Sequence, residues 1–122
     1  MASIDLQLKR AYEPAELGDG YRVLVDRLWP RGVSKEKAAL DAWEKELGPS
    51  TELRKWFGHE PERFEEFRRR YIDELRAKRA LLSSLRRRAR DGTVTLVYSA
   101  HDSEHNDAVV LAEILRRGLP NR

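Results

Sequence analysis

The sequence has 122 residues and no cysteine, which suits one domain and excludes disulfides, thiolate metal sites and a cysteine nucleophile. Hydrophobic residues make up 40% and charged residues 37% of the chain, with 24 basic against 21 acidic side chains, a balance that argues against disorder. No apolar stretch reaches the ~18 residues of a membrane span, and the N-terminus lacks a signal-peptide segment. We therefore expect a single soluble, cytoplasmic domain over residues 1–122 with no membrane contact.

Three segments of the chain have the pattern of β-strands. Residues 4–8 alternate apolar and polar side chains, as a half-buried strand does. Residues 21–25 and 93–98 are rich in β-branched and other apolar side chains, which is typical of buried strands. The segment 39–47 fits either a helical face or a short strand near residues 40–44. The sheet has a fourth strand only if this segment forms a strand.

Capping residues delimit the helices that lie between these strands. Ser34 is a candidate N-cap for a short helix from Lys35, and Ser50 or Thr51 begins a helix that stops at Gly58. A long helix begins at Pro61 and ends at residues 91–92. Unbroken, it would extend about 45 Å at 1.5 Å per residue, so we expect a break near residues 78–83.

The last predicted helix covers residues 104–117. Asp102 or Ser103 is its candidate N-cap, and Gly118 suits the position after its end. Strands that alternate with helices predict an α/β fold with three layers, in which a mainly parallel sheet of about four strands carries helices on both faces. Ligands of such sheets bind beyond the carboxyl ends of the strands. The loops at 26–34 and 99–103 begin there.

The first of these loops carries a carboxylate, two guanidinium groups and an indole. Arg27 and Arg31 present planar sets of donors that match phosphate or carboxylate, and Trp29 can form a wall beside them. Asp26 follows directly after a strand, where it can act as a base or orient an arginine. The alternative is a structural ion pair between Asp26 and one arginine.

The second loop offers polar side chains that can contact the same ligand. His101 is a candidate general acid, general base or anion ligand, and Ser99, His105 and Asn106 are candidate ligand-binding residues. A catalytic triad of Ser99, His101 and Asp102 is disfavoured, because adjacent residues on one loop rarely face each other. The zinc pattern within residues 101–105 is also disfavoured, because a helix cap falls inside it. We expect no metal and no cofactor.

Two features outside these loops bear on binding. Residues 62–90 hold eleven basic and five acidic side chains, so this helical segment carries a formal charge of +6. Such a segment can attract the phosphates of a nucleic acid, although most charged helices are simply solvated. His59 follows a helix-stop glycine and either caps the helix or lies in solvent, with Arg54 as an anion-binding neighbour one turn earlier.

Several motifs carry a family resemblance that covers almost the whole chain. They are LVDRLWPRG at 24–32, the segments 49–59, 67–75 and 95–100, and then Asp102 with His105 and Asn106. Together they resemble the bacterial YeaO-like proteins, which carry a domain of unknown function. The resemblance implies a small cytosolic α/β protein with no established activity. A lysine is usual in that family where His101 stands here, which favours a cation that faces an anion.

The YeaO-like proteins resemble a wider set that pairs an Asp-x-Arg loop with a later Cys-His-Arg motif. No cysteine is present in this chain, so thiol chemistry does not carry over. Three functions stay open at this point. The first is an anion-binding pocket at the carboxyl end of the sheet, with catalysis undecided. The second is a nucleic-acid-binding module that uses the basic helix at 62–90, and the third is an interaction subunit that uses its apolar stripe.

Overall fold

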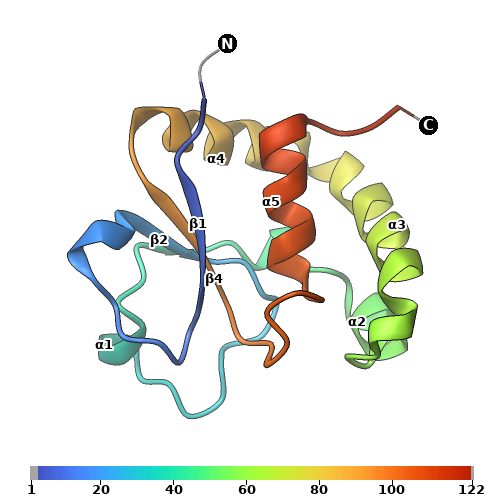
Figure 1. Ribbon diagram of the computed structural model, residues 1–122, viewed down its shortest axis with the longest axis horizontal. Helices are drawn as coiled ribbons and strands as arrows, with labels where there is room; N and C mark the ends of the chain where they lie inside the picture. Colours follow the sequence, from blue (N-terminus) through green and yellow to red (C-terminus); the bar gives the residue numbers. More distant parts are fainter. Residues whose placement is uncertain (1–2, 122) are drawn as a thin grey trace.

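A computed structural model describes residues 3–121 as a parallel sheet with helices packed around it (Figure 1). The strands are β1 (Leu6–Arg10), β2 (Tyr21–Leu24), β3 (Ala42–Trp43) and β4 (Val94–Tyr98). Their order across the sheet is β1-β4-β2-β3, and every neighbouring pair is parallel. The predicted three-layer α/β fold with a mainly parallel sheet of four strands is confirmed.

The central position of β4 brings two loops together. Leu96 of β4 pairs with Leu8 of β1 on one side and with Val23 of β2 on the other. Because the strands are parallel, β2 and β4 end at the same edge of the sheet. The loops that follow them, which carry Asp26 and Ser99, start side by side.

The two faces of the sheet are covered unequally. One face packs against α2 (Thr51–Phe57), α3 (Phe64–Leu75), α4 (Arg79–Asp91) and α5 (Asp107–Arg117), which enclose the main hydrophobic core. The other face is covered by the short α1 (Lys35–Ala38) and the loop before it, over a smaller apolar cluster. Short 3-10 turns at η1 (Leu17–Asp19), η2 (Lys45–Leu47), η3 (Pro61–Arg63) and η4 (Arg76–Lys78) join these elements.

Most predicted boundaries are confirmed by the hydrogen bonds at the helix ends. The hydroxyl groups of Ser34 and Ser50 accept the N–H groups of Lys37 and Leu53, as N-caps do. The long basic helix is interrupted at η4, which overlaps the predicted region 78–83 at Lys78. The open segment 39–47 forms the short strand β3 followed by η2, and the first strand lies two residues later than predicted.

The predicted start of the last helix is wrong. The helix α5 begins at Asp107, and its N-cap is Asn106, whose side-chain oxygen accepts the N–H of Val109 at 3.0 Å. Asp102 does form a cap, but its carboxylate accepts the N–H groups of Glu104 and His105 and holds a separate turn. Because Asp102 caps a separate turn and Asn106 caps α5, the helix begins three residues later than predicted.

Within residues 3–121, none of the helices is both long enough and apolar enough to cross a membrane.

Candidate functional site

The loops after β2 and β4 are joined at Asp26. Its Oδ2 accepts hydrogen bonds from the backbone N–H and the hydroxyl group of Ser99, both at 2.8 Å. Asp26 forms no ion pair with an arginine within the described residues, so the structural ion pair considered above is not what holds this carboxylate. The carboxylate instead ties two sheet loops together and keeps its second oxygen for other neighbours.

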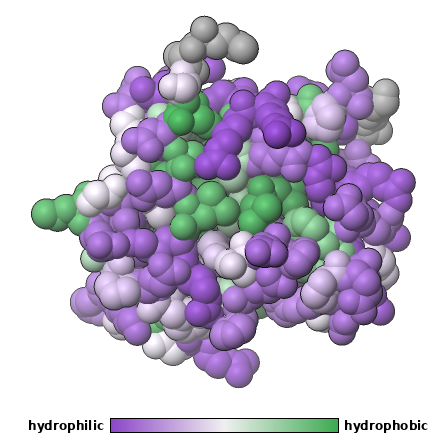
Figure 2. Space-filling model, in the orientation of Figure 1, coloured by the Kyte–Doolittle hydropathy of each residue, from purple (hydrophilic) through white to green (hydrophobic). Residues whose placement is uncertain are grey.

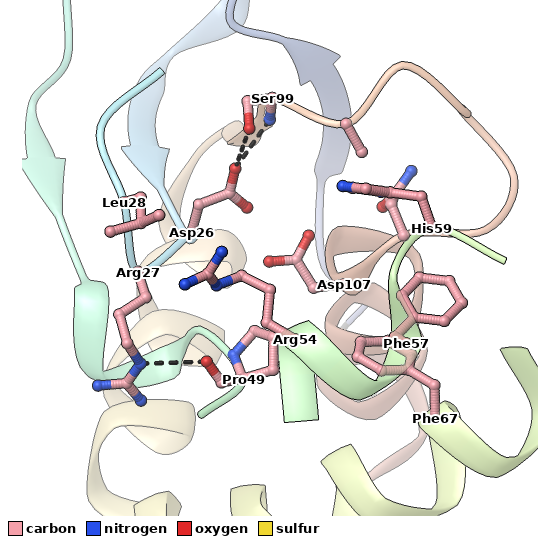
Figure 3. A pocket seen from close by; sticks show the side chains of 12 residues that line it. Asp26, Arg27, Leu28, Pro49, Arg54, Phe57, His59, Phe67, Ser99 and Asp107 are labelled. Atoms are coloured by element: carbon pink, nitrogen blue, oxygen red, sulfur yellow. Dashed lines mark hydrogen bonds between the residues drawn. The ribbon is translucent and has the colours of Figure 1, made fainter. Parts of the chain in front are cut away.

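A cavity of about 130 Å³ opens beside this carboxylate (Figure 3). Its walls combine aromatic and other apolar side chains with several charged or polar groups. The lining consists of Asp26, Arg27, Leu28, Pro49, Arg54, Phe57, His59, Phe67, Ser99, Ala100, Asn106 and Asp107. Pockets with an apolar body and a few convergent polar groups are the usual form of small-molecule sites.

One close backbone contact shapes the wall that carries Arg27. A Cβ atom on Gly48 would lie 2.6 Å from the backbone nitrogen of Arg27, so only glycine permits the chain to pass here. The contact brings the carbonyl groups of Gly48 and Pro49 to the Arg27 guanidinium, which donates to them at 2.9 and 3.1 Å. Arg27 is therefore a fixed positive charge whose Nε and one terminal nitrogen are already used.

Asp107 supplies a second carboxyl group beside Asp26. It is the first residue of α5, and its Oδ1 accepts the N–H of Ala108 at 3.0 Å. The pKa of Asp107 is raised well above the ordinary aspartate value, first by desolvation and then by the charge of Asp26 and the hydrogen bond between the two carboxyl groups. The two adjacent carboxyl groups therefore titrate as a pair, and their proximity favours the protonated form of Asp107.

Arg54 lies on α2 and directs its guanidinium into the same space (Figure 3). Its Nε is buried and has no hydrogen-bond partner among residues 3–121, and the described part of the chain offers the group no ion pair. A buried donor without a partner costs about 1–3 kcal/mol, more when the group is charged. Of the guanidinium groups that line this pocket, Arg54 alone has a buried donor left open.

The pocket lining holds two guanidinium groups and two adjacent carboxyl groups. Arg27 also lies 3.9 Å from the exposed Glu46 carboxylate outside the lining, whereas Arg54 forms no ion pair within residues 3–121. The raised pKa of Asp107 favours the neutral form of this carboxyl group, so the balance of the lining favours positive charge. His59 lies at the exposed rim with a left-handed backbone, φ 59°, and its ring is 6.1 Å from that of Phe57.

Three of the residues predicted to form the site lie away from the pocket. His101 is exposed and does not line it. Trp29 packs on the opposite face of the sheet, where its Nε1 donates to the Val33 carbonyl at 2.6 Å and its ring contacts that of Trp43. Arg31 is exposed, and its carbonyl accepts the hydroxyl group of Tyr12.

Two further predicted residues have mainly structural contacts. The ring of His105 lies 2.8 Å from the Asp102 carboxylate and contacts Phe64 edge-on, outside the lining of the pocket. The backbone N–H of Glu104, and then the His105 ring, hold the pKa of Asp102 below its ordinary value. Asn106 lines the pocket, but its side chain bonds the Asp102 carbonyl and caps α5.

The structure thus brings together Asp26, Arg27, Ser99 and Asn106 of the predicted set. It places beside them Arg54, predicted above as an anion-binding neighbour of His59, and it adds Asp107. Asp107 was missed because α5 was predicted to begin at residue 104, which places Asp107 inside a helix. The signal that identifies it is Asn106, a preferred N-cap residue immediately before an acidic residue and an apolar run. Among the residues described, no three acidic or histidine side chains are placed to hold a metal ion.

Comparison with known proteins identifies the family. Residues 5–122 match the family model DUF488-N3i, described as "Inactive DUF488-N3 subclade". The chain is 49% identical over 113 residues to the uncharacterized protein YeaO of Escherichia coli, which covers 93% of this chain and 98% of that protein. It is 42% identical over 110 residues to uncharacterized proteins of Mycobacterium bovis and Mycobacterium tuberculosis, 90% of this chain and 92% of theirs. No solved structure matches significantly. The chain therefore belongs to the YeaO-like family, within the DUF488-N3i subclade.

Proposed function

We propose that this protein binds a small phosphate- or carboxylate-bearing ligand in the pocket at the carboxyl end of β2 and β4. The observation that carries the proposal is the Arg54 guanidinium, whose buried Nε has no partner within residues 3–121. An oxyanion placed against Arg54 would accept this donor, and the planar guanidinium suits such a group.

The neighbours of Arg54 support an anionic ligand. The two guanidinium groups of the lining favour a negative group, and the contribution of Arg27 is reduced by the Glu46 carboxylate 3.9 Å away. The raised pKa of Asp107 favours the neutral form of this carboxyl group, which repels an anionic ligand less than an ionised carboxylate would.

The size of the cavity indicates how much of the ligand it encloses. A volume of about 130 Å³ is below the ~300–1,000 Å³ of typical ligand pockets, so it suits the anionic group and little more. The remainder of the ligand would lie at the mouth, beside Leu28, whose exposure of 55% leaves an apolar surface for it.

The proposal is for binding and does not include a reaction. The description of the matching family model as an inactive subclade supports this choice. The positions of His101 and His105 remove the predicted histidine from a catalytic role, because neither ring lines the pocket; His59 does so only at the exposed rim.

Titration of the protein with inorganic phosphate, and separately with acetate, tests the proposal by NMR. The Nε–H of Arg54 and the backbone N–H of Ser99 each give a resonance, and both should shift in a saturable manner with at least one of the two anions. The Arg54→Gln variant should lose the saturable shift at Ser99, because it removes the donor that holds the anion.

Lys55→Gln is the matched control, since Lys55 is the next residue on α2, is exposed, does not line the pocket and has the same charge as Arg54. It should bind like the unchanged protein. Resonances of Arg54 and Ser99 that stay in place with both anions would contradict the proposal. So would an equal loss of binding in the two variants, which would indicate a general charge effect.

A further inference from the structure

The basic segment of residues 62–90 forms two helical surfaces. They differ in how many of their basic side chains pair with a carboxylate. On α3, Arg68 pairs with Glu113, and Arg69 and Arg70 both pair with Glu66. At the following turn, Arg76 pairs with Asp73 and Lys78 with Glu46. The positive charge of this half is therefore largely matched by nearby carboxylates.

The second half, α4, has no such compensation. It contains five arginines and a single acidic residue, Asp91, at its last position. None of these arginines forms an ion pair with a carboxylate in the described part of the chain. Arg88 instead lies over the ring of Tyr21, 3.9 Å from the ring centre. The excess charge of the whole segment is thus concentrated on α4.

The end of α5 adds two more arginines to the positive charge of α4, and a groove lies between the two helix ends. A groove of about 420 Å³ lies between the ends of α4 and α5, with Arg86 and Arg90 on one side and Arg116 and Arg117 on the other. None of the lining residues is acidic across positions 3–121. Figure 2 shows strongly hydrophilic side chains gathered over this end of the molecule, at the top of the view.

Two of the four arginines are held in place by backbone carbonyls. Arg86 donates to the carbonyls of Ile114 and Leu115 at 3.0 and 2.9 Å, which belong to the last turn of α5. Arg116 donates to the Leu6 carbonyl at 3.1 Å. These bonds orient the guanidinium groups without adding a carboxylate, so their charge stays available. Arg90 and Arg117 are exposed and form no ion pair within the described residues. The pKa of Glu113 is lowered by its hydrogen bond with Arg68, and the charge of Arg117 adds to this effect.

We propose that this groove binds the sugar–phosphate backbone of a nucleic acid. All four cations are arginines, whose planar donor sets match phosphate oxygens, and a concave row of them suits a chain of regularly spaced phosphates. An anionic membrane surface is the less suitable partner, because membrane-bound helices also insert large apolar side chains. The exposed large apolar residues of the described chain are Leu17 and Leu28, and neither lines the groove.

The groove is separate from the pocket of the proposed function. Asp107 at the first turn of α5 lines the pocket, whereas Arg116 and Arg117 at its last turn line the groove. Arg117 follows Asp107 by ten residues, which is about 15 Å along the axis of α5. Binding at the groove therefore makes no use of Arg54.

Fluorescence anisotropy with labelled single-stranded and double-stranded DNA and RNA of about 20 nucleotides tests the inference at low salt. The protein should bind at least one of these probes, and its affinity should fall steeply with added salt. The double variant Arg90→Gln/Arg117→Gln should weaken binding about tenfold and reduce the slope of log affinity against log salt by about 1.4–1.8, because two phosphate contacts are lost.

The matched control is Arg69→Gln/Arg70→Gln on α3, which removes the same charge from exposed arginines already paired with Glu66. It should change the affinity less than twofold, and Arg54→Gln should leave it unchanged. No binding to any probe at low salt would overturn the inference, as would equal losses in the two double variants. Binding to vesicles of anionic phospholipid in preference to all nucleic-acid probes would also overturn it.

Discussion

Two clusters of charged side chains at the sheet differ in whether their hydrogen bonds are complete. Asp19, which is 2% exposed, bonds Arg22 at 2.6 Å, Lys9 at 2.9 Å and the N–H of Glu16 at 3.0 Å. Arg22 directs its other donors to the Ala38 carbonyl. In the pocket, by contrast, two carboxyl groups lie together and Arg54 has a buried donor without a described partner.

The difference is visible in the pKa values of the two carboxyl groups. Burial alone would raise the pKa of Asp19, yet the N–H of Glu16 together with Lys9 and Arg22 holds it below the ordinary value. Desolvation raises the pKa of Asp107, and the neighbouring Asp26 adds to the effect. A complete network stabilises the fold, whereas an incomplete one beside a cavity is the arrangement expected where a ligand supplies the missing partner.

Asp19→Ala should have the largest effect on stability. It removes the partner of Arg22, which is 3% exposed, and leaves a buried guanidinium without its carboxylate. We expect a loss of about 3 kcal/mol in the free energy of unfolding, measured by urea denaturation.

Glu16→Gln is the control for this change, because Glu16 is the exposed partner of Lys9. Surface ion pairs contribute little, so its effect should stay below about 0.5 kcal/mol. Similar losses in the two variants would show that Asp19 has no special structural role.

Asp107→Asn should change how stability depends on pH. The folded state binds the Asp107 proton more tightly than the unfolded state, so unfolding becomes easier as the pH rises from about 4 through the raised pKa, by up to about 1.4 kcal/mol per pH unit. Asparagine keeps the shape and the oxygen that accepts the Ala108 N–H, but it does not titrate. Urea denaturation from pH 4 to 8 should show this decline in the unchanged protein and its removal in the variant.

Asp102→Asn provides the comparison of opposite sign. The pKa of Asp102 lies below the ordinary value, so its stabilising effect is present above about pH 4 and is lost as the pH falls through the lowered pKa. Its difference from the unchanged protein should therefore shrink toward acid pH, whereas that of Asp107→Asn should grow toward neutral pH. Parallel curves for Asp107→Asn and the unchanged protein would contradict the raised pKa of Asp107.

Much of the fold could be predicted because local signals agree with it. The apolar runs that become β2 and β4, the capping serines before α1 and α2, and the break before α4 are all encoded within a few residues. The start of α5 was misplaced because two capping residues, Asp102 and Asn106, compete over four positions, and their hydrogen bonds decide between them.

The site was less predictable because its members come from separate elements. The proximity of Asp26 and Ser99 could be predicted because both follow strands of one parallel sheet. Trp29 follows the same strand but turns to the opposite face, where its Nε1 bonds Val33. Whether a loop side chain turns toward one face or the other depends on tertiary contacts that no local pattern records. Arg54 was predicted as an anion-binding neighbour of His59, but no local pattern placed it beside Asp26, which it reaches from α2.

Ser99→Ala should have a moderate effect on stability. It removes the hydroxyl bond to Asp26 and leaves the backbone N–H bond of the same residue in place. We expect a loss of about 1–1.5 kcal/mol, the usual value of such a hydrogen bond. Ser103→Ala is the control, since Ser103 is exposed and no described hydrogen bond uses its side chain. An equal change of melting temperature in the two variants would contradict the role of Asp26 in joining the two loops.

Arg54→Gln should have the smallest effect on stability, within about 0.5 kcal/mol in the absence of anions. Arg22 has a carboxylate partner, whereas the Arg54 side chain has no described hydrogen-bond partner that the substitution would remove. Glutamine also takes away a buried Nε donor that has no partner among the described residues. Phosphate should raise the melting temperature of the unchanged protein by mass action and leave that of the variant in place. A large loss in the free energy of unfolding without anions would mean that Arg54 stabilises the fold, as Asp19 does. The two halves of this measurement separate a group that stabilises the fold from one that is kept for a ligand.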